Sequence, residues 1–248
     1  MISEKQLMKL QNGSDIRGIA LEGVDGEHVN LTNKVCRNIG AAFALWLSAK
    51  TGKSVDTLVI GIGRDSRLSG EALENALVEG LAPQQVTIVR CSLATTPAMF
   101  MGTVFEETNF GGSIMITASH LPYNRNGLKF FTAAGGADKE DIQKILSYAA
   151  EAEEAHGTLD NVLKFDLIGR YSEYLVDKIR TALGGAEKPL AGMHIVVDAG
   201  NGAGGFFAGR ILTPLGADTT GSQFLDPDGH FPNHIPNPED PAAMREIK

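Results

Sequence analysis

The segment "GGSIMITASHLPYNRNGLKFF" (residues 111–131) consists of two apolar runs joined by a polar loop. The first run, "GGSIMIT", is typical of a buried strand that ends at Ser119, and "LKFF" is expected to follow the loop as the next strand. The loop itself holds Ser119, His120 and residues that favour tight turns, namely Asn124, Asn126 and Gly127. Taken alone, the segment is either an ordinary hairpin loop or a reactive site.

Strands and helices alternate on both sides of this segment. Apolar runs predict strands at 56–62 ("DTLVIGI") and 85–90 ("QVTIVR"), with a helix between them at 69–82 that Ser69 caps. Thr32 and Gly52 are expected to bound another helix, and Pro97 suits the first turn of a helix at 95–107. Helices at 138–157 and 166–185, and a strand–glycine–helix unit at 193–217, complete the pattern. The alternation predicts layered α/β domains with one boundary within 158–190.

Composition excludes several classes of protein. The chain has 248 residues, 43% of them hydrophobic, and a net charge of −8. The charge disfavours a general nucleic-acid surface, and the apolar runs are too short to span a membrane. Cys36 and Cys91 are too few for a disulfide framework or a zinc site, so we expect buried thiols. The first residues lack a targeting signal, which favours the cytoplasm, or a plastid if the natural N-terminus lies further upstream.

Two polar clusters precede the Ser119 segment. "GSDIRG" (13–18), with Asp15 and Arg17, is by itself typical of a surface turn. "GRDSRLSG" (63–70) follows a predicted strand directly, and strand ends are where α/β sheets present ligand groups. Its arginines and serines are equally consistent with an anion site and with a solvated corner whose side chains pair with one another.

The chemistry of Ser119 depends on its neighbours. A serine nucleophile needs a base, or must already carry a transferable group, and Lys129 suits the role of base if its pKa is lowered. The surroundings do not match the G-x-S-x-G motif of hydrolases. Adjacent Ser and His side chains on an extended strand also point in opposite directions, which disfavours a direct relay between Ser119 and His120.

A glycine-rich segment, "VVDAGNGAGG" (196–205), fits G-x-G-x-x-G and suggests a nicotinamide-linked enzyme, with Asp226 as the ribose-binding acid. Only 22 residues follow Asp226, however, too few for a complete dinucleotide-binding domain. We therefore expect the glycines to allow close packing. His230 and His234 are four residues apart, but the prolines around them exclude a helix, so a loop is expected.

The order of these clusters resembles a known family. "GSDIRG", "GRDSRLSG", "ATTP" (94–97), "TASHLPYNRNGLKFF", "VVDAGNGAGG" and "GHFPNHIPNPEDP" (229–241) together resemble the α-D-phosphohexomutases, the superfamily of phosphoglucomutases and phosphomannomutases. The resemblance implies a layered α/β/α first domain with a mixed sheet at 1–163, followed by an incomplete second α/β domain at 164–248. Most members have Asn at the position of Leu121. The version T-A-S-H-L-P is similar to plant-like members.

The resemblance also implies a reaction, the interconversion of hexose 1-phosphates and hexose 6-phosphates through a phosphoserine and a bisphosphorylated sugar. Ser119 would carry the phosphoryl group, with Mg²⁺ bound to it and a hexose bisphosphate as activator. His120 and Lys129 are associated with proton transfer and positioning, and Arg17 with the phosphoryl region. Arg64, Asn126 and Gly127 are expected to bind substrate phosphate.

The family's metal-binding, sugar-binding and C-terminal phosphate-binding motifs do not occur in this sequence. We therefore expect an N-terminal portion that has little turnover by itself and is a monomer or dimer when completed. The preferred hexose is left open, because the sugar-binding loop would decide it. Two other classes also stay open: a non-catalytic sugar-phosphate-binding or interaction module, and the nicotinamide-linked enzyme.

Overall fold

The computed structural model describes residues 2–152 and 157–245. The chain divides into two compact units. The first unit comprises residues 1–65, 69–118 and 124–165, and the second comprises residues 66–68, 119–123 and 166–248. The two short pieces of the second unit, 66–68 and 119–123, come from the polar clusters around Arg67 and Ser119.

A mixed sheet forms the centre of the first unit. Its order is β1-β2-β6-β5-β3-β4-β8, and β7 pairs with β6. The pairs β3–β4, β3–β5 and β4–β8 are parallel, whereas β5–β6, β2–β6, β1–β2 and β6–β7 are antiparallel. This confirms the predicted mixed sheet. The strands are β1 (Gln11–Asn12), β2 (Asp15–Ile19), β3 (Val59–Arg64), β4 (Thr87–Leu93), β5 (Gly112–Ile116), β6 (Arg125–Thr132), β7 (Gly135–Gly136) and β8 (Val162–Lys164).

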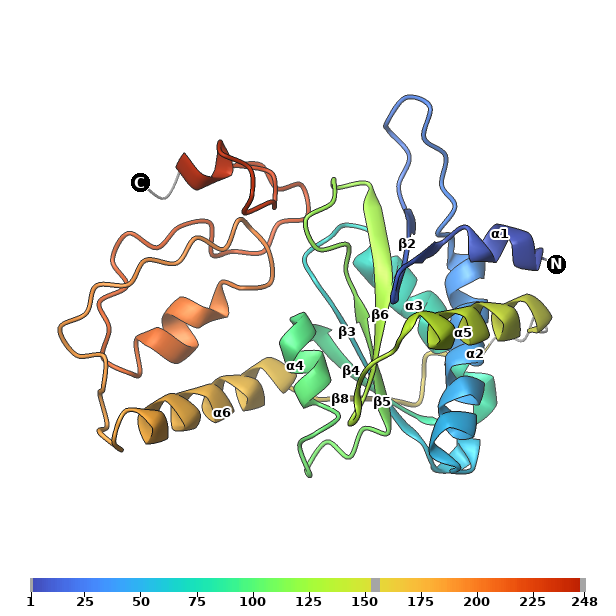
Figure 1. Ribbon diagram of the computed structural model, residues 1–248, viewed down its shortest axis with the longest axis horizontal. Helices are drawn as coiled ribbons and strands as arrows, with labels where there is room; N and C mark the ends of the chain where they lie inside the picture. Colours follow the sequence, from blue (N-terminus) through green and yellow to red (C-terminus); the bar gives the residue numbers. More distant parts are fainter. Residues whose placement is uncertain (1, 153–156, 246–248) are drawn as a thin grey trace. The chain divides into compact units, whose positions relative to one another are not determined.

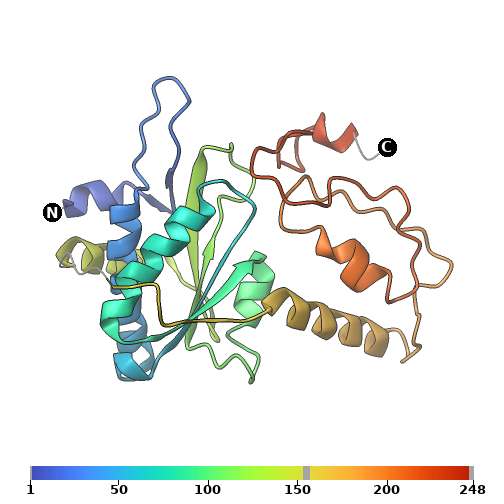
Figure 2. The ribbon, with the colours of Figure 1, turned by 180° about the vertical axis from the view of Figure 1, so that it is seen from behind.

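Helices cover both faces of this sheet (Figure 1, and from behind in Figure 2). On one face α2 packs against α3 and α5, and α1 packs against α5; α4 lies on the other face, against β3, β5 and β6. The result is the expected α/β/α layering. The helices of this unit are α1 (Glu4–Met8), α2 (Asn33–Thr51), α3 (Gly70–Leu81), α4 (Thr96–Met101) and α5 (Lys139–Glu151), with short 3₁₀ turns η1 (Val55–Thr57) and η2 (Ala82–Gln84).

The close approach of α2 and α3 depends on a glycine. A Cβ atom added to Gly80 of α3 would lie 1.9 Å from the carbonyl oxygen of Arg37 on α2, which is well inside contact distance. The pair buries Ile39, Phe43 and Leu77, all 0% exposed, against the sheet. Apolar burial of this kind is the main source of the unit's stability.

The ends of the helices follow the sequence signals in most cases. Thr32 accepts a hydrogen bond from the Val35 backbone N–H (3.2 Å), and Gly52 ends α2 with a φ of +68°. Pro97 lies in the first turn of α4, as predicted. Ser69 does occupy the N-cap position of α3, but its hydroxyl makes no capping bond, because that oxygen accepts from the amide of Asn126 instead (2.8 Å).

Several element boundaries differ from the predictions. The strand expected at 56–62 begins only at Val59, because residues 55–57 form a 3₁₀ turn that the Leu58 N–H closes. The helix expected at 95–107 ends at Met101; Gly102 and β-branched Thr103 follow, and the Thr103 hydroxyl donates to the carbonyl of Phe100 (2.7 Å). The helix expected at 138–157 ends at Glu151, and its predicted part at 153–156 lies outside the described residues.

Two predicted turns are strands. Residues 15–18 of "GSDIRG" belong to β2 (Asp15–Ile19), because Ile16 and Gly18 alternate toward the interior and pair with β6. Asn126 and Gly127 belong to β6, which begins at Arg125 rather than at Leu128. The chain therefore reverses within the preceding loop, at 117–124.

The second unit contains α6 (Leu167–Ala182), the short π-helix η3 (Phe207–Leu212) and the 3₁₀ turn η4 (Ala243–Arg245). Val176 of α6 packs against Ile211 and Leu215. The strand predicted within 193–217 is reduced to isolated parallel bridges, His194–Asp218 and Asp198–Gln223. The register shifts by one residue between the two bridges, since four positions separate His194 from Asp198 and five separate Asp218 from Gln223. Within this stretch the Val197 N–H donates to the Ser222 hydroxyl (3.0 Å).

Other expectations about the chain are met. Cys36 and Cys91 are buried free thiols, and burial raises the pKa of each to about 12. Gly205 allows the predicted close packing, since a Cβ there would lie 1.9 Å from the Leu225 carbonyl oxygen. In the described part of the chain, no helix combines the length and the apolar character needed to cross a bilayer.

Candidate functional site

Two basic side chains of the first unit, Arg17 and Lys129, bind the same carboxylate, that of Asp15. Asp15 Oδ2 accepts from Arg17 Nη2 (2.9 Å) and from Lys129 Nζ (2.5 Å). Arg17 and Asp15 lie on β2, and Lys129 lies on the neighbouring β6. Two cations on one carboxylate leave a net positive charge on this Asp15 cluster (Asp15, Arg17 and Lys129). Such a cluster attracts an anion, and its rigid strands fix the directions of the donors.

Gly127 gives the Arg17 side chain its path across the sheet. The two residues are direct partners in the β2–β6 register. A Cβ atom on Gly127 would lie 2.3 Å from the Ile16 carbonyl oxygen and 2.6 Å from Arg17 Cδ. Because Gly127 has no Cβ atom, the guanidinium of Arg17 can pass over β6, and its Nη1 donates to the carbonyl oxygen of Thr117. Gly127 thus orients Arg17, and direct binding of phosphate by Gly127 stays a prediction.

Side-chain hydrogen bonds fasten the carboxyl ends of β3 and β5. The Thr117 hydroxyl donates to Asp65 Oδ2 (2.6 Å), and the Asp65 N–H donates to the Ile116 carbonyl (3.0 Å). Asn126 is buried and donates to Ser69. The parallel strands β3 and β5 end at the same edge of the sheet, the edge that commonly presents ligand groups.

Arg64, expected to bind phosphate, is engaged in an ion pair. Its Nε lies 3.1 Å from Glu74 Oε2, and Glu74 is only 3% exposed. Burial raises the pKa of the Glu74 carboxyl, while Arg90 and Arg64 oppose that rise. Within the described residues Oε1 of Glu74 accepts no hydrogen bond. The phosphate-binding role of Arg64 stays a prediction.

The loop at 119–123 holds Ser119 and His120, both exposed. Ser119 has a φ of +57°, in the left-handed region that residues with a side chain seldom adopt. Such backbone persists only when the surrounding structure enforces it, and it is concentrated at functional sites. The expectation that Ser119 and His120 point apart on an extended strand therefore does not apply, because Ser119 is not extended.

Arg67 enforces this backbone. The side chain is 1% exposed, and its Nη2 donates to the carbonyl oxygens of Ser119 (2.9 Å) and Leu121 (2.7 Å). Its Nη1 donates to the carbonyl of Pro122 (2.7 Å), and the guanidinium lies over the Phe231 ring at 5.3 Å. Sequence reasoning missed Arg67, since nothing in "GRDSRLSG" distinguishes it from Arg64.

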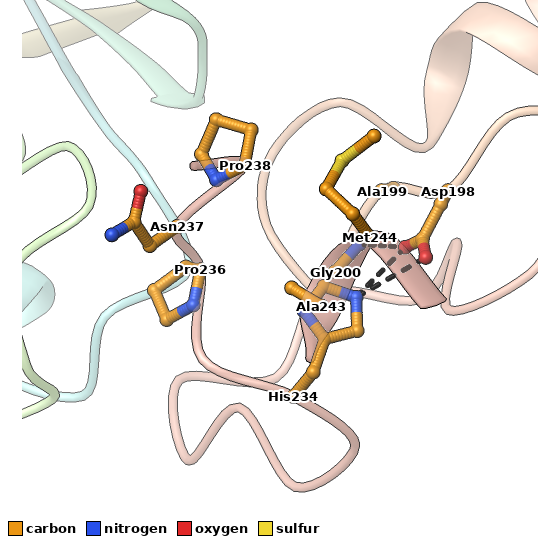
Figure 3. A pocket seen from close by; sticks show the side chains of 9 residues that line it. All are labelled: Asp198, Ala199, Gly200, His234, Pro236, Asn237, Pro238, Ala243 and Met244. Carbon is orange, nitrogen blue, oxygen red and sulfur yellow. Dashed lines mark hydrogen bonds and ion pairs between the residues drawn. The ribbon is translucent and has the colours of Figure 1, made fainter. Parts of the chain in front are cut away.

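A cavity of about 250 Å³ lies elsewhere in the second unit (Figure 3). Asp198 and His234 face each other there, with His234 Nε2 3.1 Å from Asp198 Oδ1. Burial raises the pKa of Asp198, but hydrogen bonds from Gln223 and His234 outweigh it and lower the pKa overall. His234 lies in a loop, as expected, and so does His230, which pairs with Asp228 (2.9 Å).

Residues 2–152 and 157–245 contain no cluster of three His, Cys, Asp or Glu side chains that would hold a metal ion. Asp15, the acid of the Asp15 cluster, is already bonded to two cations. The described residues therefore do not form a magnesium site by themselves.

Comparison with known protein families gives two matches. Residues 8–156 match the phosphoglucomutase/phosphomannomutase alpha/beta/alpha domain I, and residues 170–248 match alpha/beta/alpha domain II. The first match contains every residue that we singled out around Ser119, Lys129 and Arg17.

Curated relatives carry related names. A phosphoglucomutase of Neisseria meningitidis is 34% identical over 94% of this chain and 46% of its own length. A phosphoglucomutase/phosphomannomutase of Thermococcus kodakarensis is 31% identical over 96% of this chain and 50% of its own. A phosphoglucosamine mutase of Desulforudis audaxviator is 35% identical over 85% and 46%. The chain thus spans about half the length of these relatives.

Solved structures show the same fold. A phosphoglucomutase/phosphomannomutase family protein from Burkholderia thailandensis superposes with a TM-score of 0.77 at 28% identity, covering 100% of this chain and 50% of that one. A putative phosphomannomutase from Thermus thermophilus gives 0.72 at 22% identity, over 95% and 50%. By its matched domains, its relatives and its fold, the chain belongs to the phosphoglucomutase/phosphomannomutase family.

Proposed function

We propose that this protein interconverts hexose 1-phosphates and hexose 6-phosphates through a phosphoryl group carried on Ser119. The observation that carries the proposal is the loop at 119–123, in which an exposed serine is held at a positive φ by a buried arginine. Relatives named as mutases for glucose, mannose and glucosamine phosphates support the substrate class.

The reaction consists of two phosphoryl transfers. A free hydroxyl of a hexose monophosphate forms a new bond to phosphorus as the bond between phosphorus and Ser119 Oγ breaks. The sugar hydroxyl loses its proton to a base, and Ser119 Oγ gains one, so that a serine hydroxyl and a sugar phosphate result. The resulting bisphosphate turns over and returns its other phosphoryl group to Ser119. Phosphoryl transfer of this kind is catalysed mainly by alignment and by positive charge around the moving group.

The residues of the Asp15 cluster supply that charge in the proposed reaction. Arg17 is held on both sides, by Asp15 and by the Thr117 carbonyl, so its guanidinium has a fixed direction. Lys129 is held by its hydrogen bond to Asp15. In the proposed reaction its neutral amine accepts the proton that the sugar hydroxyl loses, and the resulting ammonium group returns a proton to Ser119 Oγ. The role of His120 in positioning rests on the family resemblance.

Magnesium is part of the proposal because the family resemblance implies it. A bound cation would neutralise charge on the phosphoryl oxygens. Because the described residues offer no cluster of carboxylates for it, we assign it no ligand in this chain beyond the phosphate on Ser119.

Incubation with glucose 1,6-bisphosphate and Mg²⁺ tests the proposal. Intact-mass analysis should show the gain of one phosphoryl group, and peptide mapping should place it on Ser119. Ser119→Ala should abolish the gain. Ser66→Ala, a serine in the neighbouring cluster whose hydroxyl is buried, should retain it.

Two outcomes would contradict the proposal. Phosphate on Ser66 or Ser69 would overturn the choice of Ser119. Binding of glucose 6-phosphate with no phosphoryl gain would favour the alternative, a non-catalytic sugar-phosphate-binding module.

A further inference from the structure

Arg67 is buried, and its terminal nitrogens donate hydrogen bonds to backbone carbonyls. The carbonyl oxygens of Ser119, Leu121 and Pro122 all converge on its two terminal nitrogens, at 2.7–2.9 Å. Burying a charge away from water is costly unless hydrogen bonds compensate for it. The three loop carbonyls therefore compensate for burying the Arg67 guanidinium, and the same hydrogen bonds hold the loop.

This convergence fixes the orientation of the loop's peptide groups. The chain contains no cis peptide bonds among its described residues, and in a planar trans peptide the N–H points opposite to the C=O. Because the Ser119 carbonyl points at the guanidinium, the His120 N–H points away from it. For the same reason the Tyr123 N–H is opposed to the Pro122 carbonyl. Carbonyl oxygens, which repel an anion, are thus gathered on the side of Arg67.

The segment at 229–231 packs against Arg67 and its neighbours. Phe231 covers the guanidinium, and the neighbouring Gly229 packs so closely on the Arg67 segment that a Cβ there would lie 2.4 Å from the Ser66 carbonyl oxygen. Residues 66–68, 119–123 and 229–231 all belong to the second unit. The segment "GHF" at 229–231 therefore supports the loop through Arg67.

We infer that Arg67, backed by Phe231, is a positioning residue that holds the backbone of the Ser119 loop in the conformation that phosphoryl transfer requires. The inference rests on the proposed function for its catalytic meaning. Its geometric part, the anchoring of the loop, stands on the contacts alone. In this scheme Arg67 acts through the backbone carbonyl of Ser119.

Lysine cannot replace arginine in this role. A planar guanidinium offers several donors in a fixed fork and stacks on an aromatic face, whereas an ammonium group is a compact, strongly hydrated point charge. Arg67→Lys keeps the charge but loses the fork, and Phe231→Leu keeps an apolar wall but loses the aromatic face. Arg37→Lys is the matched control, because Arg37 binds Glu79 through two nitrogens at 2.9 and 2.6 Å outside the candidate site.

Chymotrypsin cleavage after Tyr123 tests the anchoring without any activity. Tyr123 is 38% exposed, so cleavage there requires only that the loop open locally. We expect Arg67→Lys to speed this cleavage about 10- to 100-fold, Phe231→Leu about 3- to 10-fold, and Arg37→Lys not at all. Cleavage after Phe130, which is 1% exposed, reports global unfolding in the same sample. Equal rates for Arg67→Lys and the unsubstituted protein, or equal acceleration at Phe130, would overturn the anchoring.

The time course of Ser119 phosphorylation by glucose 1,6-bisphosphate tests the catalytic meaning. A positioning role predicts that Arg67→Lys lowers the rate constant at saturation at least about 10-fold, while the final extent and the half-saturating concentration change little. A lower extent at an unchanged rate constant would show that Arg67 only maintains the fold. If the unsubstituted protein takes up no phosphate while Arg67→Lys still speeds cleavage at Tyr123, the proposed function fails and the anchoring of the loop stands.

Discussion

The Asp15 cluster and the Ser119 loop use positive charge in different ways. In the cluster, Arg17 and Lys129 share one carboxylate, and both lie on paired strands whose register fixes them. In the loop, Arg67 binds backbone carbonyls, and the arginine itself fixes irregular backbone. In the Asp15 cluster, the paired strands orient the cations. In the Ser119 loop, the cation Arg67 orients the backbone.

This difference determines which cation can change its partner when an anion binds. A cation paired with a carboxylate has part of its field cancelled, and the pair can exchange partners when an anion arrives. A cation that is 1% exposed and surrounded by carbonyl dipoles cannot leave its place without exposing unsatisfied groups. We therefore expect substitutions in the cluster to change chemistry first, and substitutions around buried groups to change stability first.

Lys129→Ala should give the largest effect. Asp15 keeps Arg17 as a partner when Lys129 is removed, so no carboxylate is left without a cation and the fold should persist. Loss of its charge and of proton transfer should slow phosphorylation of Ser119 about 10²- to 10⁴-fold. The measurement is the initial rate with glucose 1,6-bisphosphate, accompanied by a thermal melt.

Lys50→Ala is the matched control, because Lys50 also pairs with an aspartate, Asp141 (3.0 Å), on helices outside the candidate site. Its rate should be unchanged. An unchanged rate in Lys129→Ala would instead remove Lys129 from the mechanism and leave the Asp15 cluster with a structural role.

Much of the fold follows from local sequence signals. The helix from Asn33 to Thr51 has both a capping threonine and a terminal glycine, and its apolar spacing is regular. The strands β3, β4 and β5 are short apolar runs followed by polar residues. The strand predicted within 193–217 is reduced to isolated bridges, and the pairing shifts by one residue between them. Hydrophobic periodicity does not predict such a shift in register.

The candidate site is less predictable because its contacts are long-range. Ser119, Lys129 and Arg17 were found through a family resemblance and not through spacing. Asp15 joins Lys129 across 114 positions of sequence, and Arg67 reaches Pro122 across 55. Arg67 differs from Arg64 in its nearly complete burial and in its hydrogen bonds to the carbonyls of the Ser119 loop, and both features become visible only when the chain is folded.

Gly127→Ala should give the next largest effect and tests whether the sheet orients Arg17. The added Cβ would overlap the Ile16 carbonyl and Arg17 Cδ, so β2 and β6 must separate or Arg17 must move. We expect a loss of about 1–3 kcal/mol in the free energy of unfolding, measured by urea titration. Gly204→Ala is the control, since nothing lies within 4 Å of its added Cβ. Equal stability of both variants would show that Gly127 does not constrain Arg17.

Glu74→Gln tests whether the partner of Arg64 holds a proton. Burial raises the folded-state pKa of Glu74 above the ordinary 4.5, so the folded protein holds more of this proton than the unfolded chain only in the pH range between 4.5 and that folded-state pKa. Stability from this group is complete below pH 4.5 and is lost as the pH rises through the folded-state pKa. Glu74→Gln has no carboxyl group to titrate, so it should not lose this stability. As the pH rises, the free energy of unfolding of the unsubstituted protein should therefore fall relative to that of Glu74→Gln. Parallel stability curves from pH 4 to pH 8 would contradict the assignment.

Asp198→Asn should have the smallest effect and the opposite pH dependence. Hydrogen bonds from neutral donors and from His234 hold the pKa of Asp198 below the ordinary 3.8, against the effect of burial. Its contribution is therefore present above pH 3.8 and is lost as the pH falls through the lower folded-state pKa. We expect the variant to be destabilised by about 1 kcal/mol at neutral pH, with the gap closing in acid. Because Asp198 and the Ser119 loop both belong to the second unit, cleavage at Tyr123 should be measured in the same variant. An unchanged cleavage rate would show that Arg67 anchors the loop independently of the cavity, whereas a faster one would extend the support of the loop from "GHF" to the Asp198–His234 pair.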